Sequence, residues 1–163
     1  MSGILVLGVG NVLLTDDGVG VHALRELLRE PWPETVTLLD GGTFTQDIFY
    51  LFKTCDMLLV LDIVHAGGKP GTLYRLTEEQ LVHKESQRLS IHDIDLLDSL
   101  RMAEHAYGFR PEMVIVGMEP ANYTSWSMEL SPAARSAFPA FVELARREIR
   151  RMSGMAQGRL HRS

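Results

Sequence analysis

The chain has 163 residues, of which 45% are hydrophobic, 7% aromatic and 23% charged, which is the length and composition of a single globular domain. This composition excludes an intrinsically disordered chain, a collagen and a low-complexity scaffold. The single cysteine, Cys55, excludes an internal disulfide framework and a multi-cysteine zinc site, and it predicts a protein of the reducing cytoplasm.

The net charge of −5 is distributed unevenly along the sequence. Residues 146–163 hold six Arg and one Glu, a net of +5, so residues 1–145 carry −10. An acidic body argues against a nucleic-acid partner, because phosphate contacts need clustered Lys and Arg. The basic end is interpreted as cations at a helix C-terminus, with an RNA or membrane contact as the alternative. No signal peptide and no membrane-spanning stretch are expected.

Strands and helices alternate along the sequence. Continuous runs rich in Val, Ile and Leu predict strands buried on both faces, at 4–9, 36–39, 57–64 and 113–118. An alternating run at 72–76 predicts an edge strand. Apolar residues at helical spacing predict helices at 18–30, 44–53 and 93–107. A last helix is expected from the cap Ser131-Pro132 to about Met152, followed by a disordered basic tail at 153–163.

This order of elements predicts a doubly wound α/β fold with a mostly parallel sheet. In such folds ligands bind beyond the carboxyl ends of the strands, at the point where the strand order reverses. The residues that directly follow each strand are therefore the candidates for a functional site.

The first predicted strand leads into residues 8–20, with the sequence GVGNVLLTDDGVG. The segment begins like a dinucleotide-binding fingerprint, but its sixth position is Leu13 and not glycine. A pyrophosphate at the start of the following helix would also face Asp16 and Asp17 and be repelled by them. The glycines are therefore interpreted as residues for turns and close backbone approach, with nucleotide binding as an alternative.

Asp62 lies inside the apolar run at 57–64, where a carboxylate is costly unless a cap, a loop hydrogen bond or another group pairs with it. The first and third strands of a doubly wound sheet usually lie side by side, so Asp17 and Asp62 should reach the same crevice. His92 starts the next helix and could close that crevice. Two carboxylates and an imidazole are a typical ligand set for a divalent transition metal, and equally a general acid–base trio. The spacing does not choose between these two.

Two further features have competing interpretations. Cys55 is disfavoured as a nucleophile, because the surrounding sequence shows neither a base nor an activating environment. Tyr123, Trp126 and Met128 lie in a long connection after the last strand and could contact a protein substrate. The alternative is that Trp126 folds back over the core.

Five motifs occur in a recognisable order: the segment 8–20, DGGT at 40–43, Asp62, SIH at 90–92 and VGMEP at 116–120. From about residue 3 to about residue 150 the chain resembles the maturation endopeptidases of nickel–iron hydrogenases. The resemblance implies a twisted, mostly parallel sheet between helices, a phosphorylase/hydrolase-like three-layer sandwich, with one peptidase domain over residues 1–152. It also implies a cytoplasmic endopeptidase, of aspartic or metal-dependent type, that removes the C-terminal extension from the precursor of the hydrogenase large subunit after nickel has been loaded.

The family's metal-binding trio maps onto Asp17, Asp62 and His92. The first position is Glu or Asp within the family, and Asp16 could substitute for Asp17 here. The implied metal is nickel supplied by the substrate precursor, and other divalent metals could occupy the site. The alternatives are a related peptidase that acts on a nickel-free protein and a non-catalytic module that binds a nucleotide or small molecule.

Overall fold

The central element is one sheet of five strands in the order β2-β1-β3-β5-β4. The computed structural model describes residues 3–43, 46–83 and 91–162, without the side chains of residues 46–48, 83, 91–92 and 156–162. The strands are β1 (Ile4–Val9), β2 (Val36–Gly42), β3 (Met57–Ile63), β4 (Leu73–Thr77) and β5 (Glu112–Met118). Only β4, which pairs with β5 at the edge, is antiparallel to its neighbour. The five predicted strands and the mostly parallel sheet are confirmed.

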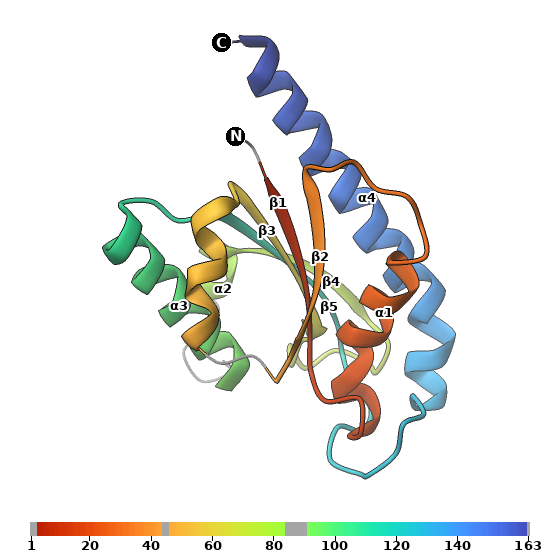
Figure 1. Ribbon diagram of the computed structural model, residues 1–163. Helices are drawn as coiled ribbons and strands as arrows, with labels where there is room; N and C mark the ends of the chain where they lie inside the picture. The colour runs from red at the N-terminus through yellow and green to blue at the C-terminus, as the bar shows by residue number, and fades with distance from the viewer. Residues whose placement is uncertain (1–2, 44–45, 84–90, 163) are drawn as a thin grey trace.

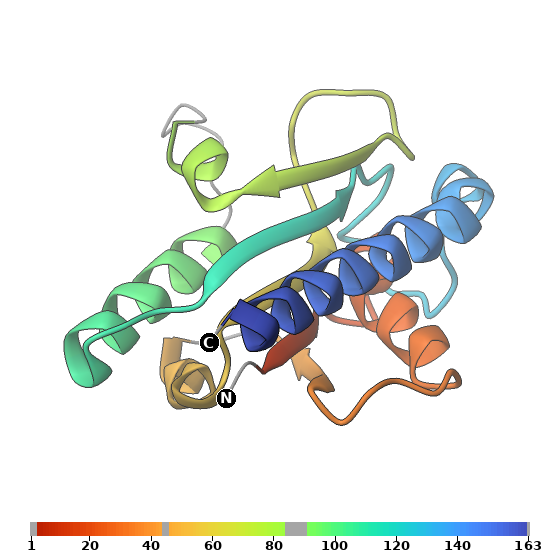
Figure 2. The same ribbon diagram turned by 90° about the horizontal axis from the view of Figure 1, so that it is seen from above.

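Helices cover both faces of the sheet and give three layers (Figures 1 and 2). One face is covered by α1 (Val19–Leu27) and α4 (Pro132–Arg162), and the other by η2 (Gln46–Thr54) and α3 (Ile91–Tyr107). Alternate residues of β1 pack into opposite clusters, Val6 with the α1 and α4 side and Leu7 with the η2 and α3 side. Both faces of β1, β3 and β5 are buried, and these parallel strands have continuous apolar sequences. The expectation that the strand at 36–39 is buried on both faces is wrong, because β2 lies at the edge of the sheet and most of its residues are exposed or half-buried.

Three of the four predicted helices are confirmed as α1, α3 and α4. The helix predicted at 44–53 is a 3-10 helix over the described residues of η2, whose aromatic side chains have low α-helix propensity. The sequence pattern does not predict α2 (Glu78–His83). Of its described side chains only Leu81 is buried, so no apolar stripe marks this short helix.

The predicted end of α4 near Met152 is wrong. The helix continues through Ser153 and Gly154, so the residues expected to begin a disordered tail belong to α4 as far as Arg162. One glycine costs a helix about 1 kcal/mol, and Met155 beyond it still packs against the core between α4 and the sheet. Apolar contact past the glycine therefore stabilises the added turns. Within the described ranges, none of the helices combines the length and the apolar character needed to cross a membrane.

Basic side chains of α4 form ion pairs with neighbouring acids. Arg146 contacts Glu30, which follows α1, at 2.8 Å and also contacts Glu143 on its own helix. Glu148 is buried between Arg151 at 2.6 Å and Arg75 of β4 at 2.9 Å. These arginines thus tie α4 to α1 and to the edge strand.

Two glycines allow α1 to lie directly against the sheet. A Cβ atom at Gly20 would collide with the carbonyl oxygen of Leu61 in β3, and one at Gly8 would lie 2.7 Å from the carbonyl oxygen of Gly20. The atoms in the way belong to the backbone, so they cannot move aside cheaply. This confirms the interpretation of these glycines as residues for close backbone approach.

Gly20→Ala is expected to destabilise the protein by about 1–3 kcal/mol, because the methyl group forces α1 away from β3. The matched control is Gly154→Ala on α4, where a Cβ atom meets nothing within 4 Å. This control should leave stability unchanged or raise it by up to about 1 kcal/mol, since alanine is the better helix former. Urea unfolding followed by circular dichroism measures both, and equal midpoints for Gly20→Ala and the parent chain would contradict the packing argument.

Candidate active site

The strand order reverses between β1 and β3, because the chain continues from β1 to β2 on one side and returns to β3 on the other. In doubly wound sheets a crevice forms at this point, beyond the carboxyl ends of the strands. The turn after β1 and the connection at residues 119–131 after β5 lie side by side there. Thr15 N donates to Ser127 O, and Ser127 N donates to Leu13 O, both at 2.9 Å. The segments that border the crevice are therefore held together by backbone hydrogen bonds.

Asp16 is fully buried and anchors this pair of segments. One carboxylate oxygen, Oδ1, accepts a hydrogen bond from Ser131 N (2.8 Å). The other, Oδ2, accepts from Ala121 N (2.9 Å), Asn122 N (3.1 Å) and Ser131 Oγ (2.7 Å). Ser131 also caps the N-terminus of α4, as predicted, because its Oγ accepts a hydrogen bond from Ala134 N. Both oxygens of Asp16 are thus engaged with a distant part of the chain.

Asp16 and Asp17 are adjacent residues of the 3-10 helix η1 (Thr15–Gly18), and this helix directs their side chains differently. Thr15 has a φ of +52°, a left-handed conformation that is unfavourable for a β-branched residue. Its Oγ1 donates to Ser125 O at 2.7 Å, which helps to hold the turn. Successive residues of a 3-10 helix point about 120° apart. Asp16 is consequently buried, whereas Asp17 is half-buried and accepts a hydrogen bond from Asn11 N at 2.7 Å.

Asp62 is the penultimate residue of β3, opposite Gly117 of β5, and is buried. Its Oδ1 accepts a hydrogen bond from Ile63 N at 2.8 Å. β1 and β3 are neighbours, as predicted, and η1 contacts β3. The structure therefore brings the segments that carry Asp17 and Asp62 to the same edge of the sheet.

His92 is the second residue of α3, and its side chain lies outside the described residues. α3 has 17 residues, about 25 Å, and it precedes β5, which runs parallel to β3. The helix therefore starts near the carboxyl edge of the sheet, as Figure 1 shows. Among the side chains that the structure describes, no three His, Cys, Asp or Glu residues gather closely enough to hold a metal ion. The joint site of Asp17, Asp62 and His92 thus stays a prediction.

Glu119 is a buried carboxylate that the sequence reasoning did not single out. Its Oε1 accepts hydrogen bonds from Ala66 N (2.9 Å), Gly68 N (2.8 Å) and Tyr74 Oη (2.9 Å). Burial and the contact with Glu119 raise the pKa of Tyr74. The available signal was a carboxylate directly after a buried strand. Glu119 fixes the loop after β3 in the way that Asp16 fixes the connection after β5.

The DGGT motif borders a second hollow, of about 300 Å³, between the ends of β1 and β2. Gly42 has a φ of +52° and donates its N–H to Asp40 Oδ1 at 2.8 Å. Its carbonyl oxygen accepts a hydrogen bond from Gly10 N at 2.7 Å. Arg25 of α1 lies 3.9 Å from Asp40, so this motif is connected both to the first turn and to α1.

A family model described as hydrogenase maturation protease matches residues 21–148. The chain belongs to the hydrogenase maturation protease family. It is 30% identical over 144 residues to the hydrogenase expression/formation protein HupD of Bradyrhizobium diazoefficiens. This alignment covers 87% of this chain and 75% of the relative.

A similar sequence and a similar solved structure, both from Escherichia coli, extend this finding. The hydrogenase 2 maturation protease of strain K12 is 35% identical over 121 residues, 73% of this chain and 74% of that protein. The solved structure of the hydrogenase maturating endopeptidase HybD superimposes with a TM-score of 0.81 at 28% identity, over 91% of this chain and 93% of that one. The expected family, fold class and endopeptidase activity are confirmed.

This hydrogenase maturation protease does not carry an activated thiol at Cys55. The side chain is buried, and burial raises the pKa of the thiol to about 12. Since the thiolate is the reactive form, Cys55 is inert near neutral pH. This agrees with the sequence interpretation that Cys55 is no nucleophile.

Cys55 should resist alkylation by iodoacetamide in the folded protein at pH 8, where the thiol stays protonated, and react within minutes in 8 M urea. Mass spectrometry of the labelled chain measures this. Cys55→Ala should keep its protease activity within about twofold, although the small cavity costs some stability. Rapid labelling of the native protein together with loss of activity in Cys55→Ala would contradict the assignment.

The two adjacent aspartates should differ sharply in their effect on stability. Asp16→Ala is expected to cost about 3 kcal/mol or more, because it empties a buried site and removes the acceptor from the N–H groups of three residues. Asp17→Ala, the matched control, removes one hydrogen bond of a half-buried side chain and should cost about 1 kcal/mol or less. Guanidinium unfolding measures both, and equal losses would contradict the separation of their roles.

Proposed function

We propose that this protease removes the C-terminal extension from the nickel-loaded precursor of the [NiFe]-hydrogenase large subunit. We further propose that it recognises the nickel of the substrate through Asp17, Asp62 and His92. Membership of the hydrogenase maturation protease family carries the first part. The position of η1 against the end of β3, at the reversal of strand order, supports the second part.

The hydrogen bonds of Asp16 support Asp17 as the carboxylate from the first turn. A ligand needs an oxygen lone pair directed at the metal, and both oxygens of Asp16 already accept hydrogen bonds. Among the described residues, Asp17 accepts one hydrogen bond, from Asn11 N to its Oδ2, and its side chain is half-buried. Such a bond to one oxygen orients a carboxylate for a ligand, as second-shell contacts do in metal sites.

In this proposal the nickel belongs to the substrate. Nickel accepts imidazole and carboxylate ligands well, so an Asp, Asp and His set complements a metal that the precursor presents. Binding through the metal lets the protease distinguish a loaded precursor from an empty one. It also holds the scissile peptide in the crevice, where the metal can polarise the carbonyl group or activate water. In this proposal nickel loading and cleavage both take place in the cytoplasm. A single cysteine, with no disulfide framework, is typical of proteins of that reducing compartment.

The buried position of Asp62 favours this role physically. A carboxylate with little exposure attracts a cation more strongly than one in bulk water, because the local dielectric constant is lower. The apolar neighbours in β3 also keep the backbone of Asp62 rigid. A metal presented at the end of β3 therefore meets a charge in a fixed position.

Asp17→Asn, Asp62→Asn and His92→Ala should each lower cleavage of the nickel-loaded precursor by about 100-fold or more, since each removes a ligand. The matched control is Asp56→Asn, which changes a carboxylate directly before the first residue of β3, at the end of the strand away from Asp62. This variant should cleave the precursor normally. Mass spectrometry of the precursor, co-expressed with and without nickel, measures the extent of cleavage.

Full cleavage by a chain that carries both Asp62→Asn and His92→Ala would overturn the ligand assignment. Equal cleavage of precursors with and without nickel would overturn the role of nickel and favour a related peptidase that acts on a nickel-free protein.

A further inference from the structure

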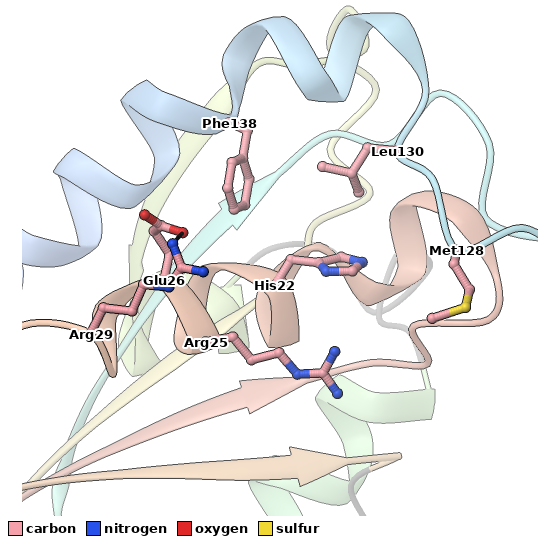
Figure 3. Close-up of a pocket in the computed structure, with 7 residues that line it drawn as sticks. All are labelled: His22, Arg25, Glu26, Arg29, Met128, Leu130 and Phe138. Atoms are coloured by element: carbon pink, nitrogen blue, oxygen red, sulfur yellow. Dashed lines mark ion pairs between the residues drawn. The ribbon is translucent and has the colours of Figure 1, made fainter.

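A cavity of about 350 Å³ lies outside the crevice, between α1, α4 and the connection after β5 (Figure 3). Residues of α1 line it together with Arg29 just after this helix, Met128 and Leu130 of the connection, and Phe138 of α4. His22 lies five residues after Asp17, about 7 Å of helix rise. The cavity is therefore adjacent to the proposed site but separate from it.

The lip of the cavity is cationic. Arg25 and Arg29 line it together with Glu26. The side chain of Arg25 is 54% exposed and that of Arg29 is 80% exposed. Arg29 lies 3.8 Å from Glu26 and Arg25 lies 3.9 Å from Asp40, distances too long for hydrogen bonds. Their guanidinium groups thus keep the capacity to bind a carboxylate in a bidentate manner. This lip contrasts with the charge of −10 on residues 1–145 as a whole.

His22 contributes a buried polar atom to the same cavity. Its Nε2 is buried, and no described residue gives it a hydrogen-bond partner. Burial and the nearby Arg25 lower the pKa of His22, so the imidazole is neutral near pH 7. In Figure 3 the ring lies between α1 and the side chains of Leu130 and Met128.

The connection beside the cavity presents apolar side chains to solvent. Trp126 is 78% exposed and Met128 63% exposed, so the interpretation in which Trp126 folds back over the core is wrong. Leu13, 45% exposed, lies beside them through the hydrogen bond from Ser127 N. Exposed Trp and Met on a segment with a fixed backbone are typical of protein–protein contact surfaces. Because Asp16 anchors this connection, the surface is continuous with the turn that carries Asp17.

We propose that this cavity and the adjoining surface dock a segment of the hydrogenase precursor next to the cleavage site, with an acidic side chain on Arg25 and Arg29 and an apolar side chain against Met128, Leu130 and Phe138. The inference rests on the proposed function, since it takes the precursor as substrate. Docking at this surface selects the protein partner, whereas the crevice selects the metal. The charge of the lip sets the chemistry of the segment, and the volume of the cavity admits one side chain of moderate size.

Steady-state cleavage of the nickel-loaded precursor by the full chain tests the docking. Arg29→Glu should raise KM about tenfold with kcat within about twofold, and the effect should weaken in 0.5 M salt. Met128→Ser should raise KM without this salt dependence. The matched control is Arg147→Glu on α4, a side chain that is 75% exposed and, like Arg29, forms an ion pair with a glutamate a few residues earlier in the chain. It should leave KM and kcat unchanged.

Surface plasmon resonance with immobilised precursor gives a readout apart from cleavage, and Arg29→Glu should weaken binding by the same factor. Unaltered KM and binding in both Arg29→Glu and Met128→Ser, with normal cleavage by the parent chain, would overturn the docking alone. A fall in kcat at constant KM would also overturn it. A parent chain that neither binds nor cleaves the precursor would overturn the proposed function and the docking with it.

Discussion

The carboxylate of Asp16 joins the turn after β1 to the connection after β5 and to the start of α4. It is a buried charge whose cost is offset by hydrogen bonds from three residues that lie more than 100 positions along the chain. These bonds add to the backbone hydrogen bonds that already join the two segments. The position of η1, and with it the direction of Asp17, depends on this contact. The exposed segment with Trp126 and Met128 depends on it as well, because its first and last residues are held by the same side chain.

In the proposed function, acidic side chains at the carboxyl edge of the sheet have two different roles. Asp16 and Glu119 are buried and accept backbone N–H groups, so they act as anchors for loops that have no secondary structure of their own. Asp17 and Asp62 occupy the reversal of strand order, where a ligand is expected. Several carboxylates can lie at one edge of the sheet because the charges of Asp16 and Glu119 are stabilised by hydrogen bonds inside the protein. In the proposed function Asp17 and Asp62 bind a cation from the substrate, and Arg25 and Arg29 bind an acidic side chain of the precursor.

Much of the fold follows from local patterns. Continuous apolar runs predict four of the strands, and an alternating run predicts the fifth, β4, at the edge of the sheet. Local patterns fail to predict an element that buries few side chains, or one whose extent depends on contacts with residues distant in the sequence. α2 buries one described side chain, so no periodicity marks it. α4 continues past Gly154, because Met155 reaches the core, and a local rule for helix ends does not include that contact.

The sequence by itself determined the alternation of strands and helices, the resemblance to hydrogenase maturation proteases, and the candidates Asp17, Asp62 and His92. Only the tertiary structure distinguished Asp16 from Asp17, which are the same residue type at adjacent positions. Their difference comes from partners 105 to 115 residues away, whose N–H groups converge on Asp16 alone. Tertiary structure likewise decided that Trp126 faces solvent and that Glu119 is an anchor. Periodicity and spacing report contacts within a few residues of the chain, whereas the burial of a single carboxylate depends on which distant segments the sheet brings together.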